Sequence, residues 1–301
     1  MIIASIAPHL EHLKKIIKHP LIDELRFNTI LPVIDEKASL LKNLKKKCGK
    51  KELWIDLITR QLFINKVIQK RYISAKINKK ISVKVPFKVF YKQTDAHVID
   101  IIDGDTLIFS QTPFELPEPG EPIKIIDNSL VIEDYFSKSD IEYINIAKKC
   151  DIHNYMLSFV ESEDDIKKLL DIDPWANIIA KIESQKGLAF VKKNYPPELT
   201  EIKLLATRNH LFIQKGVNKT KIITALKILV KKDPAAIVTS QILSSLEKTK
   251  EISVTDFSDL VLLKVLGYRN FLLNDNLCFQ QDVFKQVMQV WSEFIMQFKK
   301  D

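Results

Sequence analysis

The feature of this sequence that most limits its possible folds is the alternation of short apolar runs with longer segments of helical periodicity. Between most of these runs, apolar residues recur three and four positions apart, as in HLEHLKKIIKH and DIEYINIAKKC, which is typical of amphipathic helices. Strands separated by helices pair in parallel, because each helix returns the chain to the end where the next strand begins. The runs predicted as strands are Ile2–Ile6, Glu24–Phe27, Leu53–Leu57, Tyr155–Phe159, Ile178–Ile182, Ile202–Ala206, Ala236–Thr239 and Asn270–Leu273.

This alternation, which ends on a helix, predicts an α/β fold of the (β/α)8 TIM barrel type. The competing architecture is a doubly wound sheet, which usually carries a glycine-rich phosphate turn after an early strand. The chain has only 6 glycines and contains neither a GxGxxG nor a P-loop spacing. The closed barrel is therefore the favoured interpretation.

One segment interrupts the alternation after the third predicted strand. Residues 65–127 contain short alternating runs, several prolines and the pair Asp103-Gly104, a combination that predicts hairpins and turns. We therefore expect a barrel formed by residues 1–64 and 128–301, with a small β-rich lid subdomain inserted at 65–127.

Composition indicates a folded protein with no membrane span. Hydrophobic residues make up 46% of the 301 residues, enough for a large core, and no apolar run reaches the roughly 18–20 residues that a span needs. The first residues, MIIASIAPHLEHLKK, lack the charged lead and cleavage site of a secretion signal. The 3 cysteines are far apart and form no CxxC pair, so neither disulfides nor a zinc site are indicated. We expect a cytoplasmic protein without a membrane partner.

The charge balance favours an anionic partner. Lys and Arg number 46 against 38 Asp and Glu, a net charge of +8, and much of the excess lies in residues 37–51 and 66–80. In the first stretch Leu40, Leu41 and Leu44 recur at helical spacing, which predicts an ordinary amphipathic helix. No aromatic residues interleave with its lysines as stacking platforms for bases would require. A small anionic metabolite is therefore favoured over nucleic acid.

The segment IIAKIESQKGLAFV places a lysine and a carboxylate two residues apart at the end of a predicted buried strand. These are Lys181 and Glu183. Because residues two apart in a strand point to the same face, the two groups should emerge side by side. In a parallel barrel the carboxyl ends of the strands carry the active site. The alternative is an ion pair that only caps the strand.

Several stretches, in a fixed order along almost the whole chain, resemble the barrel domain of the pyruvate kinase family. MIIASIAPH is similar to KIVCTIGPAS, DELRFNTIL to VARLNFSHG, LWIDLITRQLF to ALDTKGPEIR, IIAKIESQKGL to IIPKIENQEGV, and AAIVTSQILSS to VICATQMLES. The inserted segment lies where that family has its lid domain, in a shortened form. The family's C-terminal domain has no counterpart in this sequence, and the oligomeric state is left open.

The resemblance implies a site for phosphoryl transfer between phosphoenolpyruvate and a nucleotide, with Mg2+ and K+ as cofactors. Such chemistry depends on cations and carboxylates that hold the reacting oxygens in place. By the match, Lys181 would be a catalytic residue and a substrate ligand, Arg26 a phosphate ligand and Glu183 a Mg2+ ligand. Ser240 stands where the family has a catalytic threonine near the site of enolate protonation.

Other matched positions depart from the family pattern. Asn209 replaces the second metal-binding aspartate, so it would bind substrate and Mg2+ without bringing a charge. Asn28 and Asp56 match two ligands of the monovalent cation, whereas Ile30 and Leu57 occupy the positions of two others. The resemblance therefore implies a weakened Mg2+ site and an incomplete K+ site.

The positions that would contact the nucleotide have changed most. Ile58 replaces a lysine, and Phe63 replaces the arginine that would contact the transferring phosphate, which removes a bidentate clamp. The sequence thus predicts a degenerate pyruvate kinase-like protein that binds a phosphorylated or carboxylate metabolite, with little or no phosphotransfer, and it disfavours nucleotide binding. The alternative is an active Mg2+-dependent enzyme of phosphoenolpyruvate and pyruvate chemistry, either a weak pyruvate kinase or an enolate lyase.

Overall fold

The computed structural model describes residues 1–32, 35–69, 72–91, 94–113, 115–127, 129–195, 202–214 and 219–298. The chain divides into two compact units, Met1–Leu57 with Asp140–Asp301, and Ile58–Ser139. We call them the first barrel and the second barrel, because each is built on a closed sheet. The second unit extends beyond the 65–127 expected from the sequence at both ends.

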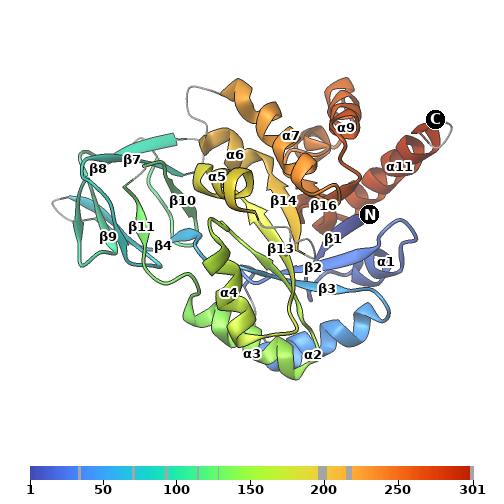
Figure 1. Ribbon diagram of the computed structural model, residues 1–301, viewed down its shortest axis with the longest axis horizontal. Helices are drawn as coiled ribbons and strands as arrows, with labels where there is room; N and C mark the ends of the chain where they lie inside the picture. Colours follow the sequence, from blue (N-terminus) through green and yellow to red (C-terminus); the bar gives the residue numbers. More distant parts are fainter. Residues whose placement is uncertain are drawn as a thin grey trace. The chain divides into compact units, whose positions relative to one another are not determined.

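The first barrel is a ring of parallel strands, eight of them in the described residues (Figure 1). Strands adjacent in chain order pair with one another, and β16 closes the ring against β1, with Ile2 opposite Phe271. The apolar runs of the sequence supply these strands. They are β1 (Ile2–Ile6), β2 (Glu24–Asn28), β3 (Leu53–Leu57), β12 (Asn154–Leu157), β13 (Asn177–Ile182), β14 (Lys203–Thr207), β15 (Ile237–Thr239) and β16 (Asn270–Leu273).

Helices lie outside this ring and bury their apolar faces against it (Figure 1). In the described part of the chain, two α-helices rather than one follow each of β14, β15 and β16, so strands and helices alternate only loosely. The helices are α1 (Leu13–Lys18), α2 (Lys37–Cys48), α3 (Lys138–Lys149), α4 (Glu163–Ile172), α5 (Gln185–Asn194), α6 (Arg208–Gln214), the 3-10 helix η2 (Lys219–Lys221), α7 (Ile222–Lys232), α8 (Ser244–Thr249), α9 (Val254–Leu266), α10 (Asp275–Phe279) and α11 (Gln281–Phe298).

The second barrel is antiparallel, with six strands among the described residues. The predicted Asp-Gly hairpin is confirmed: Asp103 and Gly104 adopt positive φ angles of 53° and 76° between β8 and β9. The strands are β4 (Leu62–Gln69), β5 (Ile73–Ile77), β7 (Phe87–Tyr91), β8 (Thr94–Ile102), β9 (Thr106–Phe109) and β10 (Pro122–Ile125), and the short strands β6 (Ile81–Ser82) and β11 (Val131–Ile132) pair separately.

The predicted fold class, a (β/α)8 TIM barrel with a small inserted β-subdomain after strand 3, is wrong in this form. The structure contains two closed barrels, and in the first one helices alternate with strands only loosely. The local signals for turns and hairpins were present, but closure of the second barrel depends on β10, which pairs with both β4 and β7. Pairing between strands so far apart along the chain is set by tertiary packing, which no local pattern encodes.

The inside of the first barrel consists of an apolar layer followed by a polar one. The apolar layer is Ile3, Trp54, Met156, Ile179, Leu205, Ile237 and Leu272. Two residues further along six of these strands, and therefore on the same inner face, a polar side chain follows. This polar layer, which is buried throughout, is Ser5, Asp56, Ser158, Lys181, Thr207 and Thr239.

Gly187 allows α5 to approach the loop between β12 and α4 closely. A Cβ at this position would lie 2.5 Å from the carbonyl oxygen of Val160, a backbone atom that cannot rotate away. We expect Gly187→Ala to lower the free energy of unfolding by about 1–3 kcal/mol, measured by urea denaturation. Lys192→Ala, on the exposed side of the same helix, should change it by less than about 0.5 kcal/mol. Equal stability of both variants would contradict the predicted clash.

Candidate functional site

The polar layer lies at the carboxyl ends of the parallel strands, the end at which barrels of this kind carry their sites. Four residues selected from the sequence meet there: Arg26, Asp56, Lys181 and Glu183. They come from β2, β3 and β13 and the residue after β13. The alternation of side chains along the strands explains why they converge. Asp56 and Lys181 each lie two residues after a member of the apolar layer, Trp54 and Ile179. Arg26 is in register with Trp54 on the neighbouring strand, and Glu183 lies two residues after Lys181.

Asp56 is the centre of this cluster. Its Oδ1 lies 3.1 Å from Lys181 Nζ, and its Oδ2 accepts a hydrogen bond of 2.7 Å from Arg26 Nε and forms an ion pair with Arg26 Nη2 at 2.7 Å. Lys181 Nζ also donates to Ser158 Oγ at 2.8 Å. Asp56 is only 2% exposed, so the carboxylate holds two cations in a region from which water is largely excluded.

Arg26 extends the cluster toward the last strand. Its Nη1 donates to Ser5 Oγ at 2.9 Å and to Asp275 Oδ1 at 2.8 Å, while Asn28 Nδ2 donates to Asp275 Oδ2 at 3.1 Å. Burial alone would lower the pKa of Arg26, but Asp56 and Asp275 raise it, so the guanidinium stays charged. Burial likewise would raise the pKa of Asp275, and Arg26 holds it below its usual value.

Glu183 forms the other side of the cluster. Its Oε2 accepts the backbone N–H of Phe159 at 3.0 Å, and its Oε1 lies 3.0 Å from His210 Nδ1 and 4.0 Å from Lys181 Nζ. The approach of His210 Nδ1 to Glu183 does not have the geometry of a hydrogen bond. The His210 ring stacks on Phe159 with centroids 5.4 Å apart. Burial alone would raise the pKa of Glu183, but Lys181 and His210 lower it to about 2.

The charged groups of this cluster leave one carboxylate in excess of the cations. In the described residues, the two cations Arg26 and Lys181 face the three carboxylates of Asp56, Glu183 and Asp275. A buried ion pair loses most of its hydration, and its partners are needed to offset that cost. A ligand anion would therefore share Lys181 and Arg26 with carboxylates already in place.

Thr207 is the one member of the polar layer in the described residues whose side-chain oxygen is buried without a hydrogen-bond partner. It lies on β14, beside β13 and two residues beyond Leu205, which is in register with Lys181. Buried hydroxyls nearly always bond to protein, water or ligand. Thr207 Oγ1 therefore marks a position at which a water or a ligand atom would complete the hydrogen bonding of the layer.

Two predicted site residues, Ser240 and Asn209, do not join the cluster through hydrogen bonds among the described residues. The carbonyl oxygen of Ser240 accepts from Arg208 Nε at 2.9 Å, in a turn where Ser240 has φ = 72°. Arg208 also makes a bidentate pair with Asp259, at 2.6 and 2.8 Å. Asn209 lies in the first turn of α6, half-buried. The guanidinium of Arg208 therefore fixes a loop rather than presenting a free cation.

The arrangement does not suit the metals that the resemblance implies. Both oxygens of Glu183 already face donors or cations, namely the Phe159 N–H, His210 and Lys181. Hard dications prefer several oxygen ligands, yet no group of three or more His, Cys, Asp or Glu side chains in the described residues could hold a metal ion.

The candidate K+ ligands are likewise engaged: Asp56 binds Arg26 and Lys181, and Asn28 Oδ1 accepts the N–H of Ile30 at 3.2 Å. As arranged, these side chains fit neither Mg2+ nor K+.

Sequence reasoning missed three contributors to the cluster: Ser5, Asp275 and His210. Ser5 could have been found from the two-residue spacing after Ile3, the same signal that places Asp56 after Trp54. Asp275 and His210 lie just beyond β16 and β14, at the first turn of short helices. No periodicity marks them, because helix starts after strands contain many polar residues for capping reasons alone.

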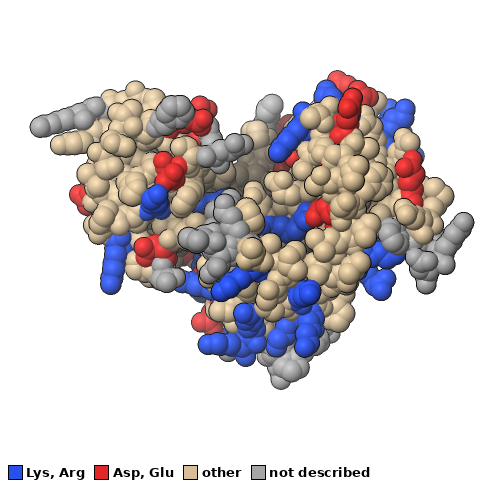
Figure 2. Space-filling model, turned by 90° about the horizontal axis from the view of Figure 1, so that it is seen from above, with Lys and Arg blue, Asp and Glu red and all other residues tan. Residues whose placement is uncertain are grey.

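The lysine-rich stretch 37–51 forms an amphipathic helix, which confirms the prediction. Leu40, Leu41 and Leu44 of α2 are buried, and its lysines form the outer face. On the face shown in Figure 2, basic side chains lie in several groups separated by uncharged surface. Lys70 and Arg71, in the stretch 66–80, lie outside the described residues. On this face, the described basic side chains therefore form separate groups and not one continuous track.

No known protein family model matches the chain, and no curated protein matches it significantly. Among the helices that the structure describes, none combines the length and the apolar character needed to cross a membrane.

Proposed function

We propose that this protein is a pyruvate kinase-like barrel protein without phosphotransfer activity, which binds a small carboxylate- or phosphate-bearing metabolite at the polar layer of the first barrel. The observation that carries the proposal is the position of Lys181 Nζ. This ammonium lies between Asp56 and Ser158 at the carboxyl ends of the strands. The neighbouring strand carries Thr207, whose hydroxyl has no hydrogen-bond partner in the part of the chain that the structure describes.

The geometry of the cluster supports binding at Lys181. Its side chain retains 11% exposure, as does that of Arg26, so both cations reach the edge of the buried region. An anion there would gain charge-assisted hydrogen bonds, which are stronger than neutral ones. The three carboxylates of the cluster restrict the gain, so we expect the site to accept small anions that also present a group to the Thr207 hydroxyl.

The absence of phosphotransfer is supported by the same contacts. Glu183, which a phosphoryl-transfer site would need for a metal ion, is committed to Phe159, His210 and Lys181. Phe63, on β4, is buried at 6% exposure, so a phenyl ring takes the position where the resemblance implies a phosphate-binding arginine. Each lost electrostatic group of this type costs roughly a hundredfold or more in rate.

Binding can be tested by isothermal titration calorimetry with oxalate and with phosphoenolpyruvate, in the presence of EDTA. We expect wild-type protein to bind at least one of them and Thr207→Val to bind it roughly 2- to 10-fold more weakly, because one neutral hydrogen bond is lost. Thr255→Val, an exposed position on α9, is the matched control and should bind as the wild type does. If neither anion binds, or if both variants bind equally, the polar layer is not the ligand site.

Catalysis is tested separately, by a coupled assay for pyruvate formation from phosphoenolpyruvate and ADP with Mg2+ and K+. We expect no turnover above background. Turnover that disappears in Lys181→Ala, with the variant shown to be folded by circular dichroism, would contradict the proposal and favour the alternative of an active enzyme. Restoration of activity by Asn209→Asp with Phe63→Arg would identify which losses abolished phosphotransfer.

A further inference from the structure

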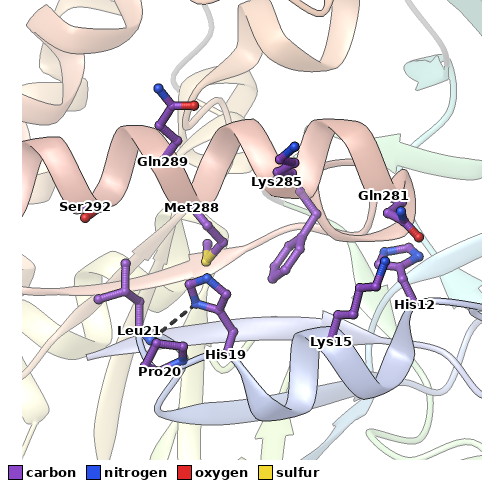
Figure 3. A pocket seen from close by; sticks show the side chains of 11 residues that line it. His12, Lys15, His19, Pro20, Leu21, Gln281, Lys285, Met288, Gln289 and Ser292 are labelled. Atoms are coloured by element: carbon purple, nitrogen blue, oxygen red, sulfur yellow. Dashed lines mark hydrogen bonds between the residues drawn. The ribbon is translucent and has the colours of Figure 1, made fainter.

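A cavity of about 480 Å3 lies between α1 and α11 on the first barrel and shares no lining residue with the polar layer (Figure 3). Its size falls in the range of sites for small organic molecules, roughly 300–1,000 Å3. α1 contributes its side chains from below and α11 from above in this view. The lining residues are His12, Lys15, His19, Pro20, Leu21, Gln281, Phe284, Lys285, Met288, Gln289 and Ser292.

The charged groups of this lining have one sign. Lys15 and Lys285 bring two ammonium groups from two different helices, and no acidic residue lines the cavity in the described part of the chain. Both lysines are exposed, so their charges are available at the rim. Figure 3 shows Lys15 reaching from α1 toward His12 and Gln281. Two cations on separate elements suit a phosphate group better than a single carboxylate, because a phosphate carries more charge and more acceptor oxygens.

His19 adds a donor of defined orientation. The backbone N–H of Leu21 donates to His19 Nδ1 at 3.3 Å, so in the neutral ring Nε2 carries the proton. Burial and the nearby Lys51, whose Nζ donates to the carbonyl oxygen of His19 at 2.8 Å, lower the pKa of His19. Figure 3 shows the ring projecting from the end of α1 toward Met288 of α11. The Nε2–H is therefore directed to the cavity side of the ring.

The other part of the lining is apolar and aromatic. The Phe284 ring is buried, with its centroid 5.8 Å from that of His19 and 6.2 Å from that of His12. Met288 and Leu21 extend this apolar surface, and sulfur and aromatic groups pack favourably against flat rings. The amide of Gln281 and the hydroxyl of Ser292 could bond to ring heteroatoms, whereas the amide of Gln289 donates to Glu293 Oε1 at 3.1 Å.

We propose that this cavity binds an aromatic organic phosphate of the nucleoside monophosphate class, with the phosphate at Lys15 and Lys285 and the ring against Phe284 and Met288. The inference is independent of the proposed function, because it uses none of the residues of the polar layer. It assigns to the outer surface of the first barrel a binding site with a charged half and an apolar half.

Calorimetry with the full chain tests the two halves of the site separately, with adenosine 5′-monophosphate, adenosine and inorganic phosphate as probes. We expect the monophosphate to bind at least about tenfold more tightly than either fragment, since it alone uses both halves. Equal binding of the monophosphate and inorganic phosphate would overturn the proposal, as would no binding at all.

Charge-reversal variants identify the site. Lys15→Glu with Lys285→Glu should weaken binding of the monophosphate by about tenfold or more, because two charge-assisted contacts become repulsive. The control is Lys14→Glu with Lys18→Glu, which makes the same charge change at exposed positions of α1 outside the lining and should leave binding within about twofold. All four positions are exposed, so the variants should fold. An equal loss in both double variants would indicate a general charge effect and contradict a site at this cavity.

Discussion

Asp56→Asn is expected to lower the free energy of unfolding by about 3–5 kcal/mol. The substitution keeps the shape of the side chain but removes the only carboxylate that contacts both Lys181 and Arg26 in the described residues. Asp275 still faces Arg26, so the larger part of the loss should come from Lys181, whose remaining carboxylate, Glu183, is 4.0 Å away. Urea denaturation followed by circular dichroism measures the change.

The matched control is Asp171→Asn, on the exposed face of α4, which should change the unfolding free energy by less than about 0.5 kcal/mol. A double-mutant cycle with Lys181→Met isolates the Asp56–Lys181 pair, and we expect the two losses to be strongly non-additive. Additive losses, or an Asp56→Asn variant as stable as the control, would show that water reaches the cluster and compensates its charges.

The stability contributed by Glu183 is expected to disappear as the pH falls from about 4.5 to about 2, the ordinary and the folded-state pKa of this group. The folded-state pKa is the lower one, so between these values the native state remains ionised while the unfolded chain binds a proton. Proton binding then favours unfolding. The contribution is complete above pH 4.5, amounts to roughly 3 kcal/mol, and is lost as the pH falls through 2.

The measurement is the difference in unfolding free energy between the wild type and Glu183→Gln, taken at intervals across this range in the presence of EDTA. The difference should shrink steadily with falling pH, because protonated glutamate and glutamine are both neutral. Asp171→Asn supplies the baseline for general acid effects. A difference that stays constant across the range would mean that Lys181 and His210 do not stabilise the charge of Glu183.

These two experiments also bear on the proposed function. A cluster of paired charges can hold the strand ends of a barrel together without any ligand, and removal of a partner is then costly. Binding of an anion at Lys181 would have to redistribute these contacts. The Thr207 hydroxyl, which has no hydrogen-bond partner among the described residues, allows such binding to be tested at a side chain whose loss does not leave a buried charge unpaired.

The position of the site could be predicted from the sequence because it follows from local spacing. Lys181 and Glu183 lie two residues apart at the end of a strand, and side chains at that spacing share a face whatever the rest of the fold does. Asp56 and Arg26 were found by resemblance. Neither local spacing nor resemblance shows whether the two cations are available to a ligand. Asp275 and His210 reach the cluster only through tertiary contacts.

The strands of the first barrel, the amphipathic helix α2 and the Asp103-Gly104 turn follow from the sequence alone, because each depends on side-chain periodicity or backbone preference within a few residues. Closure of the inserted segment into a barrel of its own follows only from tertiary packing, since β10 must pair with β4 and β7, which lie much earlier in the chain. Tertiary packing also sets how the charged side chains of the cluster pair with one another. The carboxylate partners of Arg26 and Lys181 come from three different strand ends, and their arrangement depends on distances that no single segment of the chain can specify.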